Sequence, residues 1–190
     1  KIKEMADLID GVCGTGGEPL LQFNPLKLLL KRLKELGLAT KLDTNAYSPE
    51  RLRNLVKLEL VDYVAVDVKA PLTREKYAKA TGLPFIGWKL VRNVEKSIKL
   101  LNEAGVEWEA RTTIVPRLND NREDVEEIAK NLGNPRLYAI QQFRSSGGTL
   151  DPSYSNLPSP TREELEKLAK VAKKYVKKVV IRGLFGEVEV

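Results

Sequence analysis

Two kinds of hydrophobic pattern alternate along this chain. Short apolar runs are typical of buried strands, and longer segments with apolar residues at helical spacing are typical of amphipathic helices. The runs predict strands over residues 8–15, 39–44, 63–68, 108–115, 137–143 and 179–181. The helical spacing predicts helices over residues 26–36, 49–57, 73–80, 91–104, 121–131 and 161–174. Residues 145–160 are rich in Gly, Pro, Ser and Asn, which predicts a loop.

Capping residues support the boundaries of the predicted helices. Ser48 and Pro49 suit the N-cap and the first position of the helix over residues 49–57. Thr161 and Glu164 form a Thr-x-x-Glu sequence, which predicts a capping box at the start of the last helix. Gly37 follows the helix over residues 26–36 and suits its C-terminal cap.

The order of these elements predicts the fold class. Strands that alternate with helices indicate an α/β protein with a mostly parallel sheet covered by helices. The strand over residues 63–68 is apolar without alternation, as expected for a strand that is covered on both faces. No linker-like stretch interrupts the pattern, so we expect one domain over residues 1–190. The pattern leaves open whether the sheet is an open doubly wound sheet or a full or partial barrel.

Composition excludes several kinds of chemistry. The 190 residues include one Cys and no His, which rules out an internal disulfide and the Ser–His and Cys–His catalytic arrangements. One thiol alone cannot complete a structural zinc site or hold an iron–sulfur cluster. We expect this single thiol, Cys13, to be a small buried hydrophobic group in the middle of its strand.

Charge and hydropathy predict a water-exposed surface. Hydrophobic residues make up 42% and charged residues 31% of the chain, which is typical of globular proteins. No apolar run reaches the length of a membrane span and no signal peptide is evident, so we expect a cytoplasmic protein. The net charge of +6 is spread over Lys- and Glu-rich helices, which favours a solvated surface over the alternative of a nucleic-acid patch.

Polar residues follow the predicted strands where the carboxyl ends of a parallel sheet meet. In such a fold these ends form the working surface, so we expect the polar groups to face one crevice. Their mixture of acids, amides, hydroxyls and cations suits a zwitterionic ligand that also carries sugar hydroxyls. The groups are Thr15, Gly16, Gly17 and Glu18; Asp43, Thr44 and Asn45; Asp67 and Lys69; Arg111, Thr112 and Thr113; and Gln141, Gln142 and Arg144.

Each of these groups also has an ordinary structural interpretation. Gly16 and Gly17 suit a tight turn, because glycine adopts positive φ at no steric cost. Asp43 could cap the loop that follows its strand. Asp67 and Lys69 are two residues apart on a strand and could form an ion pair on one face. It is their placement at successive strand ends that favours a binding site.

Five segments of the chain resemble one known family. The Gly-Gly-Glu segment VCGTGGEPLLQ (residues 12–22) resembles that of radical S-adenosylmethionine (SAM) enzymes. KLDTNAYSPERL (41–52), VDYVAVDVKAP (61–71), RTTIVPRLNDNREDVEEIAKNL (111–132) and QQF (141–143) narrow the resemblance to the glycyl-radical-enzyme activases. Within that group the activating proteins of anaerobic ribonucleoside-triphosphate reductase are the most similar, followed by those of pyruvate formate-lyase.

The resemblance implies a fold, cofactors and a partner. The fold would be a partial (β/α) barrel of the radical SAM type, with SAM and a [4Fe–4S] cluster at its mouth. The reaction would be reductive cleavage of SAM to a 5′-deoxyadenosyl radical, which abstracts a glycine hydrogen from a partner glycyl radical enzyme. The alternatives are another radical SAM enzyme that forms a deazaguanine or modifies RNA, and a non-catalytic module that binds a nucleotide or a partner protein.

The resemblance also implies roles for individual residues. The backbone of Thr15, Gly16, Gly17 and Glu18 would receive the methionine amine of SAM. Asp43, Thr44 and Asp67 would lie by the SAM carboxylate, with a monovalent cation at Asp43 and Asp67. Lys69 would neutralise the carboxylate or face the substrate. Arg111 and Thr113 would line the adenosyl and substrate region, and Arg144 would lie near the ribose or substrate.

Two departures from the family pattern carry expectations of their own. Ala46 stands where the family usually has glycine, a mild change provided that the turn does not need a positive φ. The Cys-x-x-x-Cys-x-x-Cys segment of the family is missing, so we expect a chain that lacks the first βα unit and is inactive alone, with weak SAM affinity. We also expect the edge strand left exposed by that loss to be paired in a homodimer or otherwise covered.

Overall fold

The computed structural model describes residues 2–149 and 151–190, which form two compact units. Unit 1 consists of residues 1–67 and 92–109, and unit 2 consists of residues 68–91 and 110–190. The strand β4 (Glu107–Ile114) and the helix α4 (Gly87–Ala104) each pass from one unit into the other. The expectation of a single domain over residues 1–190 stays a prediction.

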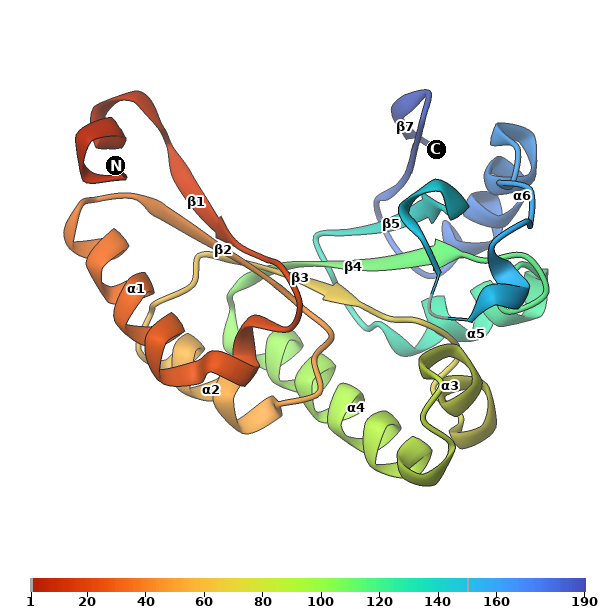
Figure 1. Cartoon of the computed structure of the whole chain (residues 1–190), viewed down its shortest axis with the longest axis horizontal. Helices are drawn as coiled ribbons and strands as arrows, with labels where there is room; N and C mark the ends of the chain where they lie inside the picture. Colours follow the sequence, from red (N-terminus) through yellow and green to blue (C-terminus); the bar gives the residue numbers. More distant parts are fainter. Residues whose placement is uncertain (1, 150) are drawn as a thin grey trace. The chain divides into compact units, whose positions relative to one another are not determined.

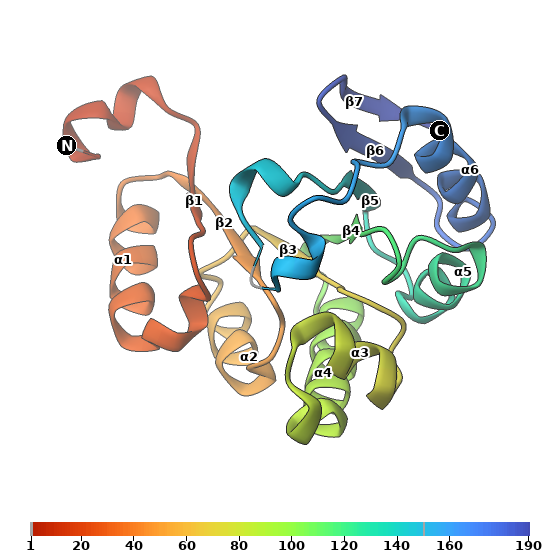
Figure 2. The ribbon, with the colours of Figure 1, turned by 45° about the vertical axis from the view of Figure 1, so that its right-hand side comes forward.

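Unit 1 is built on three parallel strands that are neighbours in sequence order. They are β1 (Gly11–Gly14), β2 (Ala39–Thr44) and β3 (Tyr63–Asp67). The helices of this unit are α1 (Phe23–Glu35), α2 (Pro49–Lys57) and most of α4, with short 3₁₀ helices at Lys3–Leu8 and Pro19–Gln22. Both Figure 1 and Figure 2 show α1 and α2 on the same side of these strands.

Unit 2 contains the second half of β4 and the last three strands, β5 (Leu137–Gln142), β6 (Val179–Gly183) and β7 (Gly186–Glu189). β5 and β6 run parallel, and β7 returns antiparallel to β6. The helices are α3 (Arg74–Thr81), the start of α4, α5 (Arg122–Asn131) and α6 (Arg162–Ala172). Three short 3₁₀ turns lie at Pro84–Ile86, Ser145–Gly147 and Pro152–Tyr154. Figure 2 shows α5 and α6 side by side, and the two helices are in contact.

Most predicted elements are confirmed to within a few residues. The strand over residues 39–44 and the helix over residues 49–57 have the predicted bounds, and the capping box of Thr161 and Glu164 is present. β7 was not predicted, because it is polar and largely exposed, so its sequence carries no apolar run. Its acids instead pair with cations, as in the 2.6 Å contact between Arg182 Nε and Glu187 Oε2.

Buried apolar side chains of the helices and strands form the core of each unit. In unit 1, Leu30 and Leu33 of α1 and Leu42 of β2 are almost fully buried, and α1 contacts β2. In unit 2, Ile128 of α5 and Leu165 of α6 are fully buried. Burying a leucine or isoleucine stabilises a fold by about 1.5–3 kcal/mol, so these residues contribute much of the folding free energy.

The two tryptophans have opposite environments. Trp108 on β4, in unit 1, is 2% exposed, and its indole N–H has no acceptor within hydrogen-bond distance among the described residues. Trp88 at the start of α4, in unit 2, is 53% exposed. Among the described residues, no helix is both long enough and apolar enough to cross a lipid bilayer.

Cys13 is exposed, so the prediction of a buried thiol is wrong. β1 pairs with β2 and is the first strand in the sheet order, and Cys13 lies in register with Lys41. Side chains alternate between the two faces of a strand, so Cys13 shares with Lys41 the face opposite the buried Leu42.

Ala46 adopts a left-handed conformation with a φ of 59°, so the turn after β2 does need a positive φ. Alanine in place of the family's usual glycine was expected to be a mild change only without a positive φ, so that expectation is wrong. Neighbouring groups hold this conformation: the Ala46 N–H donates to Thr44 Oγ1 at 3.1 Å, and Ser97 Oγ donates to the Ala46 carbonyl at 2.8 Å. A non-glycine residue in this region costs about 1–2 kcal/mol.

We expect Ala46→Gly to change the free energy of unfolding by less than about 1 kcal/mol. Glycine relieves the strain of the left-handed backbone, which stabilises the fold. It also removes a buried methyl group and gives the unfolded chain more backbone freedom, and these two losses offset the gain. Ala46→Val should cost about 2 kcal/mol or more, because a β-branched residue is a steric outlier at this φ. Urea denaturation measures both. Equal stability of the Val variant and the parent protein would contradict the strained turn.

Candidate functional site

Glu18 ties the loop after β1 to the end of β2. Its Oε1 accepts hydrogen bonds from Thr44 Oγ1 at 2.8 Å and from the N–H of Leu20 at 3.1 Å. Its Oε2 accepts from the N–H of Asn45 at 2.7 Å. Both oxygens of this carboxylate therefore join groups of the protein, and hydrogen bonds to an ionised acceptor are stronger than neutral ones. The sequence predicts Glu18 as a site residue. In the structure its side chain joins the loop after β1 to the loop after β2.

The backbone at Gly16 and Gly17 is open. Gly16 has a φ of 124°, which only glycine adopts readily. A Cβ added at either glycine would meet no atom within 4 Å. This loop therefore presents its main chain to open space directly beside the strand ends, and side chains at these positions would cover it.

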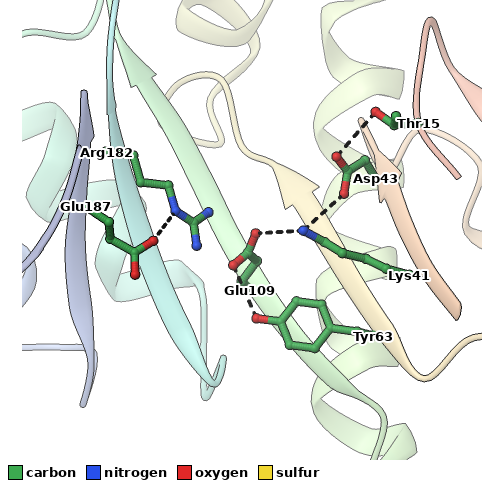
Figure 3. A network of polar contacts seen from close by, with 7 residues as sticks. All are labelled: Thr15, Lys41, Asp43, Tyr63, Glu109, Arg182 and Glu187. Atoms are coloured by element: carbon green, nitrogen blue, oxygen red, sulfur yellow. Dashed lines mark hydrogen bonds and ion pairs between the residues drawn. The ribbon is translucent and has the colours of Figure 1, made fainter. Parts of the chain in front are cut away.

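Asp43 lies on the same face of β2 as Lys41, opposite the buried Leu42. It receives a hydrogen bond from Thr15 Oγ1 at 3.3 Å, and Lys41 Nζ lies 3.5 Å from its Oδ1 (Figure 3). Asp43 pairs in register with Ala65 on β3, and Asp67 is two residues further along that strand. Side chains two residues apart share a face, so Asp43 and Asp67 lie on the same face of adjacent strands.

A buried carboxylate continues this polar network across the sheet. Glu109 on β4 is 2% exposed, and its Oε1 lies 3.5 Å from Lys41 Nζ. Its Oε2 accepts a hydrogen bond from the Tyr63 hydroxyl at 3.2 Å, and Lys41 Nζ lies 5.6 Å from the centre of the Tyr63 ring. Figure 3 shows the chain of contacts from Thr15 through Asp43 and Lys41 to Glu109 and Tyr63.

Sequence reasoning missed Lys41, Tyr63 and Glu109. One signal was available: Lys41 and Asp43 are two residues apart on a strand, which puts both on one face. Glu109 is also an acid within a largely buried strand, and such a group needs a partner. The pairing itself depends on the register between strands, which the sequence does not reveal.

In unit 2, a short segment after β3 lies beside β4. The N–H of Val68 donates to the Arg111 carbonyl at 2.9 Å, and Thr112 Oγ1 donates to the Val68 carbonyl at 2.7 Å. Asn119 Nδ2 donates to the carbonyls of Lys69 at 2.9 Å and Thr113 at 3.0 Å. The structure thus brings together three predicted site residues, Lys69, Arg111 and Thr113.

The side chains of β4 in unit 2 divide between its two faces. Thr112 is buried and accepts a hydrogen bond from the Tyr138 hydroxyl at 2.9 Å. Burial raises the pKa of Tyr138 above its ordinary value, so this phenol is a neutral donor at physiological pH. Arg111 and Thr113 flank Thr112 in sequence and therefore lie on the opposite face.

The remaining predicted groups, on and after β5, differ in their roles. The Gln142 side chain donates to the Pro160 carbonyl at 2.8 Å and accepts from the N–H of Leu184 at 2.9 Å, so it holds two loops in place. Gln141 lies in register with Arg182 on the other face of β5. Arg144 is exposed and precedes the turn at Ser145–Gly147.

A metal centre made of protein ligands alone is not found among residues 2–149 and 151–190. No three side chains of His, Cys, Asp or Glu in this part of the chain are placed to hold one ion. The sequence contains a single Cys, and an iron–sulfur cluster is ordinarily held by several thiolates.

Comparison with known proteins identifies the family. The family model described as the radical SAM superfamily matches residues 1–132. MJ1227 of Methanocaldococcus jannaschii, named for a proposed role as a glycyl-radical enzyme activating enzyme, is 39% identical over 181 residues, which is 95% of this chain and 74% of that protein. A 7-carboxy-7-deazaguanine synthase of Thermococcus kodakarensis is 40% identical over 108 residues, which cover 56% of this chain and 38% of that protein.

A solved structure shows the same fold. A domain of the pyruvate-formate lyase-activating enzyme of Bacteroides vulgatus superposes with a TM-score of 0.72 at 18% identity, covering 92% of this chain and 100% of that one. The predicted α/β fold of the radical SAM partial-barrel type is therefore confirmed. Radical SAM enzymes use SAM and a [4Fe–4S] cluster, as the resemblance implied. From the family match over residues 1–132 and the identity to MJ1227, this chain belongs to the radical SAM superfamily.

Proposed function

We propose that this chain is the SAM-binding core of a glycyl-radical-enzyme activase. The observation that carries the proposal is the attachment of the Gly-Gly-Glu loop to the Asp-Thr-Asn segment through Glu18, which accepts from both Thr44 and Asn45. This attachment places the accessible backbone of Gly16 and Gly17 next to Asp43 at the end of β2. Backbone carbonyls are acceptors for the methionine ammonium group of SAM.

The residues of unit 1 fit the methionine end of SAM. An added Cβ at Gly16 or Gly17 would meet nothing within 4 Å, so a ligand can approach the main chain closely there. Asp43 and Asp67 share a face beside this loop. In this proposal Thr15, Gly16, Gly17 and Glu18 receive the amine through their backbone, and Asp43, Thr44 and Asp67 border the carboxylate end.

The assignments proposed for residues of unit 2 follow from the resemblance to the family. Lys69 and Arg111 are cations, and Thr113 adds a hydroxyl, with their backbones joined through Val68 and Asn119. We assign Lys69 to the carboxylate of SAM or the substrate side, and Arg111 and Thr113 to the adenosyl and substrate region. Arg144, exposed after β5, is assigned to the ribose or substrate side.

The residues present do not fit the [4Fe–4S] cluster. Cys13 is the single Cys of the chain, and it lies on the exposed face of β1. No step is therefore assigned to a cluster bound by these 190 residues. SAM supplies the hydrogen-abstracting adenosyl group in the family's reaction, and this chain's own residues bind and orient it.

The partner in this proposal is a glycyl radical enzyme, since MJ1227 is named as an activator of such enzymes. A second candidate function is formation of a deazaguanine, which the 40% identity to the Thermococcus kodakarensis synthase favours. That match covers 56% of this chain, against 95% for MJ1227, so activation is the better-supported function. A homodimer through β1, the first strand in the sheet order, stays a prediction.

The SAM site can be tested directly by titration of the ¹⁵N-labelled protein. We expect SAM to shift the amide signals of residues 15–18 and 43–45 at millimolar concentrations, because the cluster that would strengthen binding has no ligands here. Asp43→Asn should weaken the response at least about threefold, because a neutral amide oxygen is a weaker acceptor for Thr15 Oγ1 and holds the amine-binding loop less firmly. Glu163→Gln, on the exposed start of α6, is the matched control. Shifts confined to other parts of the chain would overturn the proposed site.

Glu18→Gln tests the attachment that carries the proposal. Glutamine has one acceptor oxygen and cannot accept from the N–H groups of both Leu20 and Asn45, so the variant should lose about 1–3 kcal/mol of unfolding free energy in urea. Glu50→Gln removes an exposed acid of α2 and should change stability by less than about 0.5 kcal/mol. If both variants unfold at the same urea concentration, Glu18 does not hold the two loops together.

Activity gives a separate prediction. After reconstitution with iron and sulfide and reduction by dithionite, this 190-residue chain should form no 5′-deoxyadenosine from SAM, because one thiol cannot hold the cluster. Chromatography of the reaction mixture against a protein-free control measures the product. Turnover above that control would show that the chain holds a cluster by other means.

A further inference from the structure

The residues beside Asp43 suggest where the site obtains its positive charge. The resemblance predicts a monovalent cation at Asp43 and Asp67. Lys41 Nζ instead lies 3.5 Å from Asp43 Oδ1 (Figure 3). We propose that the Lys41 ammonium group is a built-in cation of this site and supplies the charge that a bound Na⁺ or K⁺ would otherwise supply.

Three strands of unit 1 hold this ammonium group in place. Lys41 on β2 lies in register with Tyr63 on β3, and its Nζ is 5.6 Å from the centre of the Tyr63 ring. On its other side Nζ lies 3.5 Å from Glu109 Oε1 of β4. Two carboxylates and one aromatic face therefore surround a single ammonium group, and both kinds of neighbour attract a cation.

The burial of Glu109 gives the lysine a role in the fold as well as in the site. Glu109 is 2% exposed, and a buried carboxylate is costly unless it is paired and hydrogen-bonded. Tyr63 donates one hydrogen bond to it at 3.2 Å, and Lys41 supplies the opposite charge. The same ammonium group thus supplies positive charge both to the buried Glu109 on β4 and to Asp43 at the end of β2.

A metal ion next to Asp43 would meet this charge. A cation that binds the Asp43 carboxylate would come within a few ångströms of Lys41 Nζ, and two like charges at that distance repel one another. The structure therefore disfavours Na⁺ or K⁺ at Asp43. It also predicts that the charge at this position is the same whichever salt surrounds the protein.

The proposal rests on the proposed function only for the identity of the ligand, so its test uses no SAM. Melting temperatures are measured in NaCl, in KCl and in tetramethylammonium chloride at the same ionic strength, since the last cation is too large to replace Lys41. We expect the unmodified protein to melt within about 1 °C in all three salts. Sodium-23 relaxation of the same sample should match that of a protein without the site.

Variants of Lys41 make the test sharper. Lys41→Met should lower the melting temperature by about 5 °C or more in tetramethylammonium chloride, and NaCl or KCl should restore a part of that loss. Lys41→Arg keeps the charge and should show no such dependence on the cation. Lys34→Met is the matched control, because it removes a lysine paired with Asp62 away from this network, and its loss should be equal in all three salts.

Two results would overturn the proposal. One is a higher melting temperature of the unmodified protein in NaCl or KCl than in tetramethylammonium chloride, because the site would then bind a metal ion despite Lys41. The other is a Lys41→Met variant whose melting temperature is the same in all three salts. Should that variant not fold, the salt comparison and the sodium-23 measurement on the unmodified protein decide the question. Failure to bind SAM would contradict the proposed function and leave this result unaffected.

Discussion

The carboxylate of Glu18 is the interaction on which the candidate site depends. It accepts from Leu20 in its own loop and from Thr44 and Asn45 in the next one, so a single side chain fixes two strand ends together. Together with the hydrogen bond from Thr15 to Asp43, it fixes the backbone of Gly16 and Gly17 relative to Asp43. Because an ionised acceptor strengthens each bond, this carboxylate stabilises the structure and also shapes the surface that faces a ligand.

One face of the unit 1 strands carries a network of charged side chains. Lys41, Asp43 and Glu109 form a connected set, and Glu109 is buried within it. Charges in such a place stabilise one another, because removing one takes a counter-charge away from a buried neighbour. The conformation of Asp43 therefore depends on Lys41 and Glu109, which are not assigned to the proposed ligand. Substitutions of these two residues should affect ligand binding indirectly, through Asp43.

Much of the fold followed from local sequence signals, and the parts that did not depend on non-local packing. The bounds of β2 and α2 and the capping box at Thr161 were predictable because hydrophobic spacing and caps act within a few residues. The exposure of Cys13 and the contact of Lys41 with Glu109 depend on which strands are neighbours and in what register. The strand ends were predicted as polar site positions, whereas the internal roles of Glu18 and Gln142 required the atomic contacts.

The two tryptophans give each compact unit its own fluorophore. Trp108 is buried in unit 1 and Trp88 is largely exposed in unit 2, so their emission maxima should differ, with Trp108 at the shorter wavelength. Unfolding shifts the emission of Trp108 far more than that of Trp88, which already contacts water. Intrinsic fluorescence of the natural sequence therefore follows the opening of unit 1. Comparison with circular dichroism of the whole chain then reveals whether the two units unfold in one cooperative step or in sequence.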